Sequence, residues 1–122
     1  MRLTALKSSS SSVVIKYTDP KLIKASVYTY FKELCLKHEE INRGLWFGSW
    51  ITGTPSPGSD VDICLILSFS PKPIRERIAD YLPDGFPVGI DLFPYTEAEF
   101  SRLAKENLRW HRCITSGIEL NR

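Results

Sequence analysis

The sequence has little that points to a membrane, a nucleic acid or a disulfide framework. No apolar stretch of its 122 residues is long enough to span a membrane, and the N-terminus lacks the apolar core of a signal peptide. The formal net charge of +2 is too small to demand a nucleic-acid or membrane partner. The three cysteines form no CxxC pair and lie near no histidine cluster. We therefore expect a cytoplasmic protein with reduced thiols, and neither a membrane nor a nucleic acid as its partner.

The composition that remains is that of one folded domain. Apolar residues make up 43% of the chain and charged residues 25%, as in ordinary globular proteins. The length is sufficient for one hydrophobic core and too short for two. Residues 1–18 include five consecutive serines and are expected to form a flexible arm. Residues 19–122 are accordingly predicted to form a single domain.

Helical and strand patterns alternate through this predicted domain. Asp19 and Pro20 suit the start of an amphipathic helix, whose apolar residues recur at helical spacing as far as Leu34. Short apolar runs predict three strands, over residues 43–49, 60–68 and 88–95, separated by a loop over 52–59 and a helix over 73–82.

Two further elements are expected towards the C-terminus. Thr96 and Glu99 form the sequence pattern of a capping box at the start of a last helix, and a short edge strand is predicted after Gly117. In the helix over 73–82, Ile74, Ile78 and Leu82 recur at intervals of four residues and predict its buried face. The order of elements predicts an α/β fold, in which helices pack against a small sheet.

Three aspartates stand in or beside the predicted strands. Asp60 and Asp62 face the same side of their strand, roughly 6.5 to 7 Å apart, and Asp91 joins them if its strand is a neighbour. Carboxylates gathered in apolar surroundings repel one another unless a cation neutralises them. Oxygen ligands favour Mg²⁺, and two such ions could clamp the attacking and leaving oxygens of a phosphoryl-type reaction. Taken alone, however, the aspartates also fit a loop-end cap and a solvated strand.

Gly48 and Ser49 provide a place for a phosphate group. A glycine at a strand end lets the backbone approach a ligand closely, and the serine adds a hydroxyl donor. The stretch from Gly48 to Gly53 is not a P-loop, because Thr54 stands where the required lysine would be. A triphosphate could therefore be held between the Gly-Ser pair and metal ions on the two aspartates.

The Gly-Ser pair, ten residues, the Asp-Val-Asp stretch and the later Asp91 together resemble the minimal nucleotidyltransferases of the DNA polymerase β superfamily. The spacing matches the family pattern GSx₁₀DxD, and the resemblance extends from residue 20 to about residue 120. Gly53 and Ser59 also stand where these proteins commonly carry Gly and Ser. The resemblance implies that Gly48, Ser49 and Ser59 bind the nucleotide. It also implies a mixed sheet of three to four strands flanked by helices.

The resemblance implies a reaction as well. Members of the family use two Mg²⁺ ions to transfer a nucleoside monophosphate, here AMP from ATP, to a hydroxyl group. Asp60 and Asp62 match the residues that bind the nucleotide-associated metal, and Asp91 matches the residue that helps to hold the second metal and activate the acceptor. Stand-alone members are often antitoxins that adenylylate a HEPN-domain toxin. The expected activity is therefore that of a protein adenylyltransferase with a HEPN-domain partner.

One departure from the family pattern supports an alternative. Many relatives carry an arginine shortly after the Gly-Ser pair, whereas Trp50, Ile51 and Thr52 are uncharged here. The chain could then be a catalytically weak module that neutralises or scaffolds a HEPN partner by occlusion. Modification of RNA or an antibiotic is a third alternative, although an antibiotic-modifying enzyme normally needs a further domain. The sequence leaves open the acceptor, the base preference and the oligomeric state.

Overall fold

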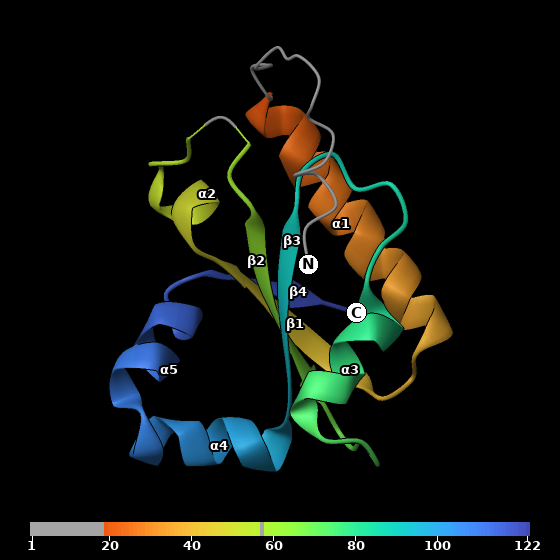
Figure 1. Ribbon diagram of the computed structural model, residues 1–122, viewed down its shortest axis with the longest axis vertical. Coiled ribbons are helices and arrows are strands. Elements are labelled where there is room, and N and C mark those ends of the chain that lie inside the picture. Colours follow the sequence, from red (N-terminus) through yellow and green to blue (C-terminus); the bar gives the residue numbers. More distant parts are fainter. Residues whose placement is uncertain (1–18, 57) are drawn as a thin grey trace.

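The computed structural model describes residues 19–56 and 58–122. The arm expected over residues 1–18 lies outside the described residues. Helices pack on both faces of a twisted sheet (Figure 1). The elements in chain order are α1 (Pro20–Lys37), β1 (Ile41–Phe47), α2 (Ser49–Thr52), β2 (Val61–Leu67), α3 (Ile74–Tyr81), β3 (Ile90–Thr96), α4 (Glu97–Glu106), α5 (Leu108–Thr115) and β4 (Ile118–Asn121).

The sheet has four strands in the order β3-β2-β1-β4. Strands β2 and β3 are parallel, whereas β1 is antiparallel to both β2 and β4. The sheet is thus mixed, as the family resemblance implied. Strand β2 lies second in this order and is buried along its whole length except at Asp62, as expected of a strand covered on both faces.

Two apolar clusters cover the two faces of the sheet. The larger cluster packs α1 and α3 against the face that carries Ile63 and Leu65 of β2. The smaller cluster packs Phe100 of α4 and Ile114 of α5 against the face that carries Cys64 and Ile66. Because side chains alternate along a strand, Asp62 points to the same face as Cys64 and Ile66.

Several predictions about the elements are confirmed. Helix α1 begins at Pro20, and the side chain of Asp19 caps it by accepting a hydrogen bond of 2.9 Å from the backbone N–H of Lys21. The capping box is present, since Thr96 Oγ1 accepts from the Glu99 N–H and Glu99 Oε1 accepts from the Thr96 N–H. The edge strand expected after the last glycine is β4, and β1, β2 and β3 lie within two residues of the predicted strands.

The prediction for α3 was right for Ile78, which is partly buried and packs against the larger apolar cluster, and wrong for the other two residues. Ile74 is 36% exposed and Leu82 is 50% exposed, whereas Arg77 is only 4% exposed. The Arg77 guanidinium donates to both carboxylate oxygens of Glu99, at 2.7 and 3.0 Å, and to the carbonyl oxygen of Pro94 at 2.9 Å. These bonds satisfy a charge that would otherwise be costly to bury. They also lower the pKa of Glu99 to about 2.

Two local boundaries also differ from the prediction. The expected last helix is two helices, because the chain breaks at Asn107, whose side chain caps α5 by accepting from the N–H of Trp110. The first residues after Gly48 form the single helical turn α2 before the loop begins.

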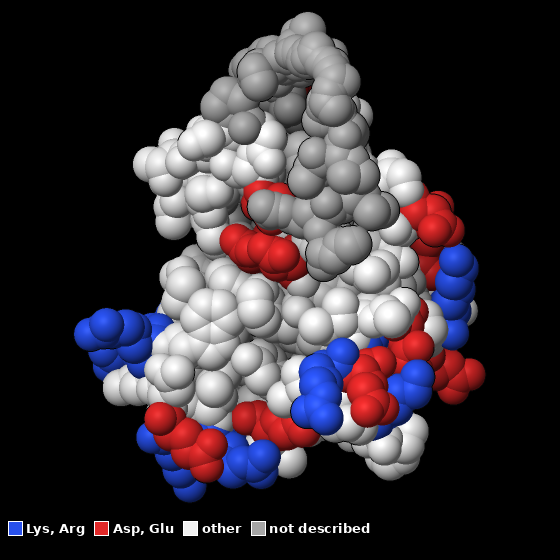
Figure 2. All heavy atoms as spheres, in the orientation of Figure 1, with Lys and Arg blue, Asp and Glu red and all other residues white. Residues whose placement is uncertain are grey.

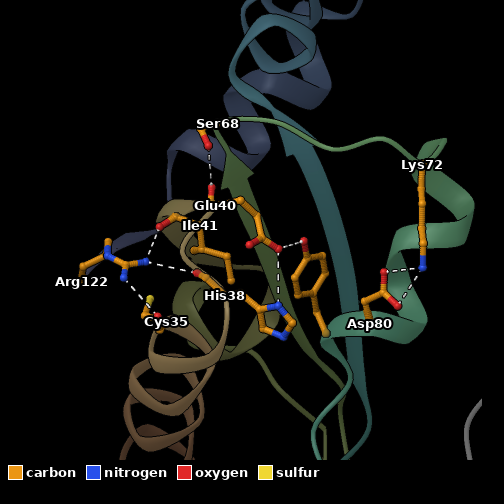
Figure 3. Close-up of polar contacts among 9 residues, drawn as sticks. Cys35, His38, Glu40, Ile41, Ser68, Lys72, Asp80 and Arg122 are labelled. Atoms are coloured by element: carbon orange, nitrogen blue, oxygen red, sulfur yellow. Dashed lines mark hydrogen bonds and ion pairs between the residues drawn. The ribbon is translucent and has the colours of Figure 1, made fainter.

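The C-terminal residue holds the far end of α1 to the sheet (Figure 3). The Arg122 guanidinium donates to the carbonyl oxygens of Cys35 and Ile41, at 3.1 and 2.6 Å. A cation at this position compensates the unpaired carbonyls at the end of a helix. Beside it, Glu40 accepts a hydrogen bond of 2.6 Å from the Tyr81 hydroxyl, which joins α3 to the same end of the molecule.

Candidate active site

The last residue of β1 and the first residues of β2 and β3 lie at the same end of the sheet. Asp62 lies directly opposite Asp91 on the parallel neighbour β3 and opposite Phe47 on the antiparallel neighbour β1. Neighbouring strands are about 4.8 Å apart, so the two aspartates are adjacent across the sheet. Asp60 immediately precedes β2. The pairing of β2 with β3, which the sequence could state only as a condition, thus brings Asp91 to the other two aspartates.

The three carboxylates interact electrostatically. Burial, followed by the charges of Asp91 and Asp60 and a side-chain hydrogen bond with Asp91, raises the pKa of Asp62 to about 6. All of these causes disfavour the ionised form of Asp62. The site therefore holds more negative charge than its surroundings accommodate easily.

The donor set fits a hard divalent cation. All three side chains offer only carboxylate oxygens, which are the ligands that Mg²⁺ prefers. Among residues 19–56 and 58–122, no three His, Cys, Asp or Glu side chains already form a metal-ligand arrangement. Asp91 is exposed, so a change of its rotamer would disturb no core packing.

Gly48 allows the chain to pass directly against the Asp62 carboxylate. Its backbone has φ +91° and ψ −162°, a combination that is essentially restricted to glycine. A Cβ atom at this position would overlap Asp62 Oδ2. The sequence analysis expected Gly48 to permit a close approach to a ligand, and in the structure it permits a close approach to this carboxylate.

Ser49 and Ser59 lie at the two ends of the segment between β1 and β2. Ser49 is the first residue of α2, and its carbonyl oxygen accepts from the N–H groups of Gly53 and Thr54 at 3.0 and 3.1 Å. The Ser59 hydroxyl accepts a hydrogen bond of 2.7 Å from the Ser56 N–H, so it helps to shape the loop before Asp60.

Trp50 fixes this loop, a role that the sequence analysis missed. The indole Nε1–H of Trp50 donates to the carbonyl oxygen of Ser59 at 2.9 Å. The bond ties α2 to the residue that precedes Asp60. Trp50 is half-buried, and the signal that the sequence offered was a large aromatic residue directly after the Gly-Ser pair.

Uncharged side chains adjoin a group of acidic side chains on one face of the molecule. Figure 2 shows a group of acidic atoms near the middle of one face, above a surface of uncharged side chains, whereas the Lys and Arg atoms lie towards the edges of that face. Coulombic attraction for a cation is stronger where water and competing charges are few.

Comparison with known protein families decides what kind of domain this is. Residues 27–112 match the family model of the nucleotidyltransferase domain. The chain belongs to this family. Nucleotidyltransferase domains in general transfer a nucleoside monophosphate and use a nucleoside triphosphate with a divalent metal ion.

A solved structure supports the fold of this nucleotidyltransferase domain. A protein from Sulfolobus solfataricus, described as a candidate nucleotidyltransferase, superimposes with a TM-score of 0.52 at 17% sequence identity. The match covers 67% of this chain and 73% of the other. The predicted α/β fold with a small mixed sheet is thereby confirmed. A comparison with curated proteins gives no significant match. In the part of the chain that the structure describes, no helix has the length and apolar character needed to cross a membrane.

Proposed function

We propose that this nucleotidyltransferase domain transfers AMP from ATP to a hydroxyl group on a partner protein. The observation that carries the proposal is the register of the parallel strands, which sets Asp62 beside Asp91. Gly48 lies against the Asp62 carboxylate, and the charge of Asp60 acts on Asp62. The chain belongs to the nucleotidyltransferase family, and its three carboxylates lie at one end of the sheet. These are the chemical groups that such a transfer requires.

In this proposal Asp60 and Asp62 would hold the metal ion that accompanies the nucleotide. Asp91 would help to hold a second ion and would accept the proton of the acceptor hydroxyl. Bound Mg²⁺ would neutralise the carboxylates and stabilise negative charge on the phosphates. The pKa of Asp62, raised by burial and by its two acidic neighbours, is consistent with a site that is completed by a cation.

In this proposal the triphosphate would lie along the segment between β1 and β2. Gly48 leaves the space beside Asp62 free of a side chain, and Ser49 follows it with a hydroxyl group. Ser59, whose hydroxyl shapes the loop before Asp60, would position the nucleotide through that loop. Together these residues would orient the α-phosphate towards the acceptor and hold the leaving pyrophosphate.

The proposed acceptor lies on a HEPN-domain protein, and the pair would act as antitoxin and toxin. The resemblance to minimal nucleotidyltransferases supports this assignment. The position of the acids is compatible with it, because β3 is an edge strand of the described sheet and Asp91 is exposed there. A hydroxyl group of another protein can thus reach Asp91 without displacing a core residue.

The test is transfer of label from α-labelled ATP in the presence of Mg²⁺, with and without a HEPN-domain protein. We expect the partner to be labelled by the wild type and not by Asp60→Asn or Asp62→Asn. Asp84→Asn removes an exposed carboxylate from the turn before β3 and serves as the matched control, which should label like the wild type. Equal labelling by all four proteins would contradict the proposal.

A second candidate function is occlusion of the partner without catalysis. It is favoured by Trp50, because this residue structurally fixes the loop in the stretch where many relatives carry a charge. A variant with Asn at all three aspartates distinguishes the two functions. Full neutralisation of the toxin by that variant would support occlusion, and loss of neutralisation would support adenylylation.

A further inference from the structure

An aromatic cluster lies on the same sheet face as the three aspartates. On β3, Asp91 and Phe93 point to one face because one residue separates them, and Phe93 packs with the smaller apolar cluster of that face. On β1, Phe47 stands directly opposite Asp62 and belongs to the same cluster. Side chains opposite each other in an antiparallel pair have Cβ atoms about 5 Å apart. Phe47 and Phe93 of the aromatic cluster are therefore direct neighbours of Asp62 and Asp91 on this face of the sheet.

Helix α5 completes this cluster with Trp110. The ring centroids of Trp110 and Phe93 are 5.1 Å apart, and each ring is 5.6 to 5.7 Å from Phe47. The Trp110 indole Nε1–H donates to the Tyr95 hydroxyl at 2.9 Å, which fixes the orientation of the indole. Residues from β1, β3 and α5 thus hold the three rings in a fixed arrangement.

The outer two rings are only half-buried. Phe47 is 3% exposed and belongs to the core, whereas Phe93 and Trp110 retain accessible surface. Helix α4 lies at the end of this face away from α2, and α5 lies between α4 and α2 (Figure 1). The uncharged surface beside the acidic atoms continues from them across the same face (Figure 2).

We infer that Phe93 and Trp110, whose rings stand at 72° to each other, form a corner that holds the base of the nucleoside triphosphate, with the base stacked on one ring and against the edge of the other. This inference rests on the proposed function, since it assigns the base of the same substrate. Asp91 and Phe93 are two positions apart along β3, about 6.5 to 7 Å, a distance that a ribose can span between a phosphate and a base. A base with its π-face on an aromatic ring gains stacking energy without requiring a particular hydrogen-bond pattern. The two rings are then specificity-determining residues that favour a nucleotide over a bare polyphosphate.

The experiment compares the binding of Mg-ATP with the binding of Mg-tripolyphosphate by calorimetric titration. Tripolyphosphate offers the phosphates and lacks the base and the ribose. We expect the wild type to bind ATP more tightly. Phe93→Leu and Trp110→Leu should weaken ATP binding about 5- to 150-fold, the effect of losing one aromatic ring, and change tripolyphosphate binding by less than about twofold. Phe93→Tyr, which keeps a ring, should restore ATP binding.

Phe69→Leu is the matched control, because Phe69 is 64% exposed and follows the opposite end of β2. It should change the affinity for neither ligand. If Phe93→Leu and Trp110→Leu weaken both ligands equally, the rings have only a structural role and the inference is overturned. Equal wild-type affinities for ATP and tripolyphosphate would overturn it without any variant, while leaving the proposed function intact. If the wild type binds neither ligand, the proposed function fails together with the inference.

Discussion

Replacing Asp62 with asparagine should stabilise the metal-free protein while abolishing its activity. In the folded protein the pKa of Asp62 is raised from 3.8 to about 6, chiefly by burial and then by the charges of Asp91 and Asp60. The folded state therefore holds the proton more tightly than the unfolded state. The resulting penalty is absent below pH 3.8, grows as the pH rises towards 6, and is fully present above 6.

The magnitude follows from the size of the shift. A rise from 3.8 to about 6 corresponds to at most about 3 kcal/mol, at about 1.4 kcal/mol per pH unit. Because Asp62 is only half-buried, solvent screening reduces this figure, and we expect Asp62→Asn to raise the free energy of unfolding by about 1 to 2 kcal/mol at pH 7.5.

The assay is urea denaturation in the presence of a chelator, at pH 7.5 and at pH 3.5. The gain should be present at pH 7.5 and nearly vanish at pH 3.5, where the wild-type carboxyl group is protonated in the folded state and mostly protonated in the unfolded state. Asp84→Asn, which removes an exposed carboxylate, should change stability by less than about 0.5 kcal/mol at either pH. A loss of stability in Asp62→Asn at pH 7.5 would refute the reasoning, because it would show that the carboxylate stabilises the fold without a cation.

Three further predictions concern Gly48 and Trp50 at the site and Glu99 beyond the opposite end of β3. In a chemical denaturation, Gly48→Ala should lower the free energy of unfolding by about 3 kcal/mol, because its Cβ would overlap Asp62, and the variant should not transfer AMP. Gly53→Ala, with open space around it, should lower the free energy of unfolding by only about 1 kcal/mol. Glu99→Gln should lower the free energy of unfolding by about 3 kcal/mol at pH 7, because Arg77 would lose its charged partner. The loss should shrink as the pH falls from 4.5 towards 2, because the lowered pKa of Glu99 means that its stabilising charge is lost over this range. An equally large loss in Glu97→Gln would contradict this. Trp50→Phe, which loses the indole donor, should cost about 1 kcal/mol and speed proteolysis of the loop over 53–59, and an unchanged cleavage rate would refute the tether.

The fold could be predicted largely because its signals are local. Asp19 caps α1, the Thr96–Glu99 capping box starts α4, and the continuous apolar run of β2 marks a strand that is covered on both faces. Each of these features depends on residues that are close in sequence. The buried face of α3 could not be predicted in the same way, because burial of Arg77 depends on Glu99 in another helix.

The candidate site shows the same division between local and long-range information. The spacing of Gly48 and Asp62 is visible in the sequence, but their contact depends on the antiparallel pairing of β1 with β2. The register that sets Asp91 beside Asp62 depends on the pairing of two strands joined by a helix, which no local pattern specifies. Phe93 and Trp110 meet only because α5 folds back onto the sheet, so no spacing in the sequence relates them.

The central claim is that Asp60, Asp62 and Asp91 together bind divalent metal. Anomalous diffraction from a crystal soaked with Mn²⁺ and a non-hydrolysable ATP analogue tests it most directly. The account predicts anomalous density between the three carboxylates and the phosphates of the analogue. Ordered phosphates with no anomalous density near these carboxylates would contradict it.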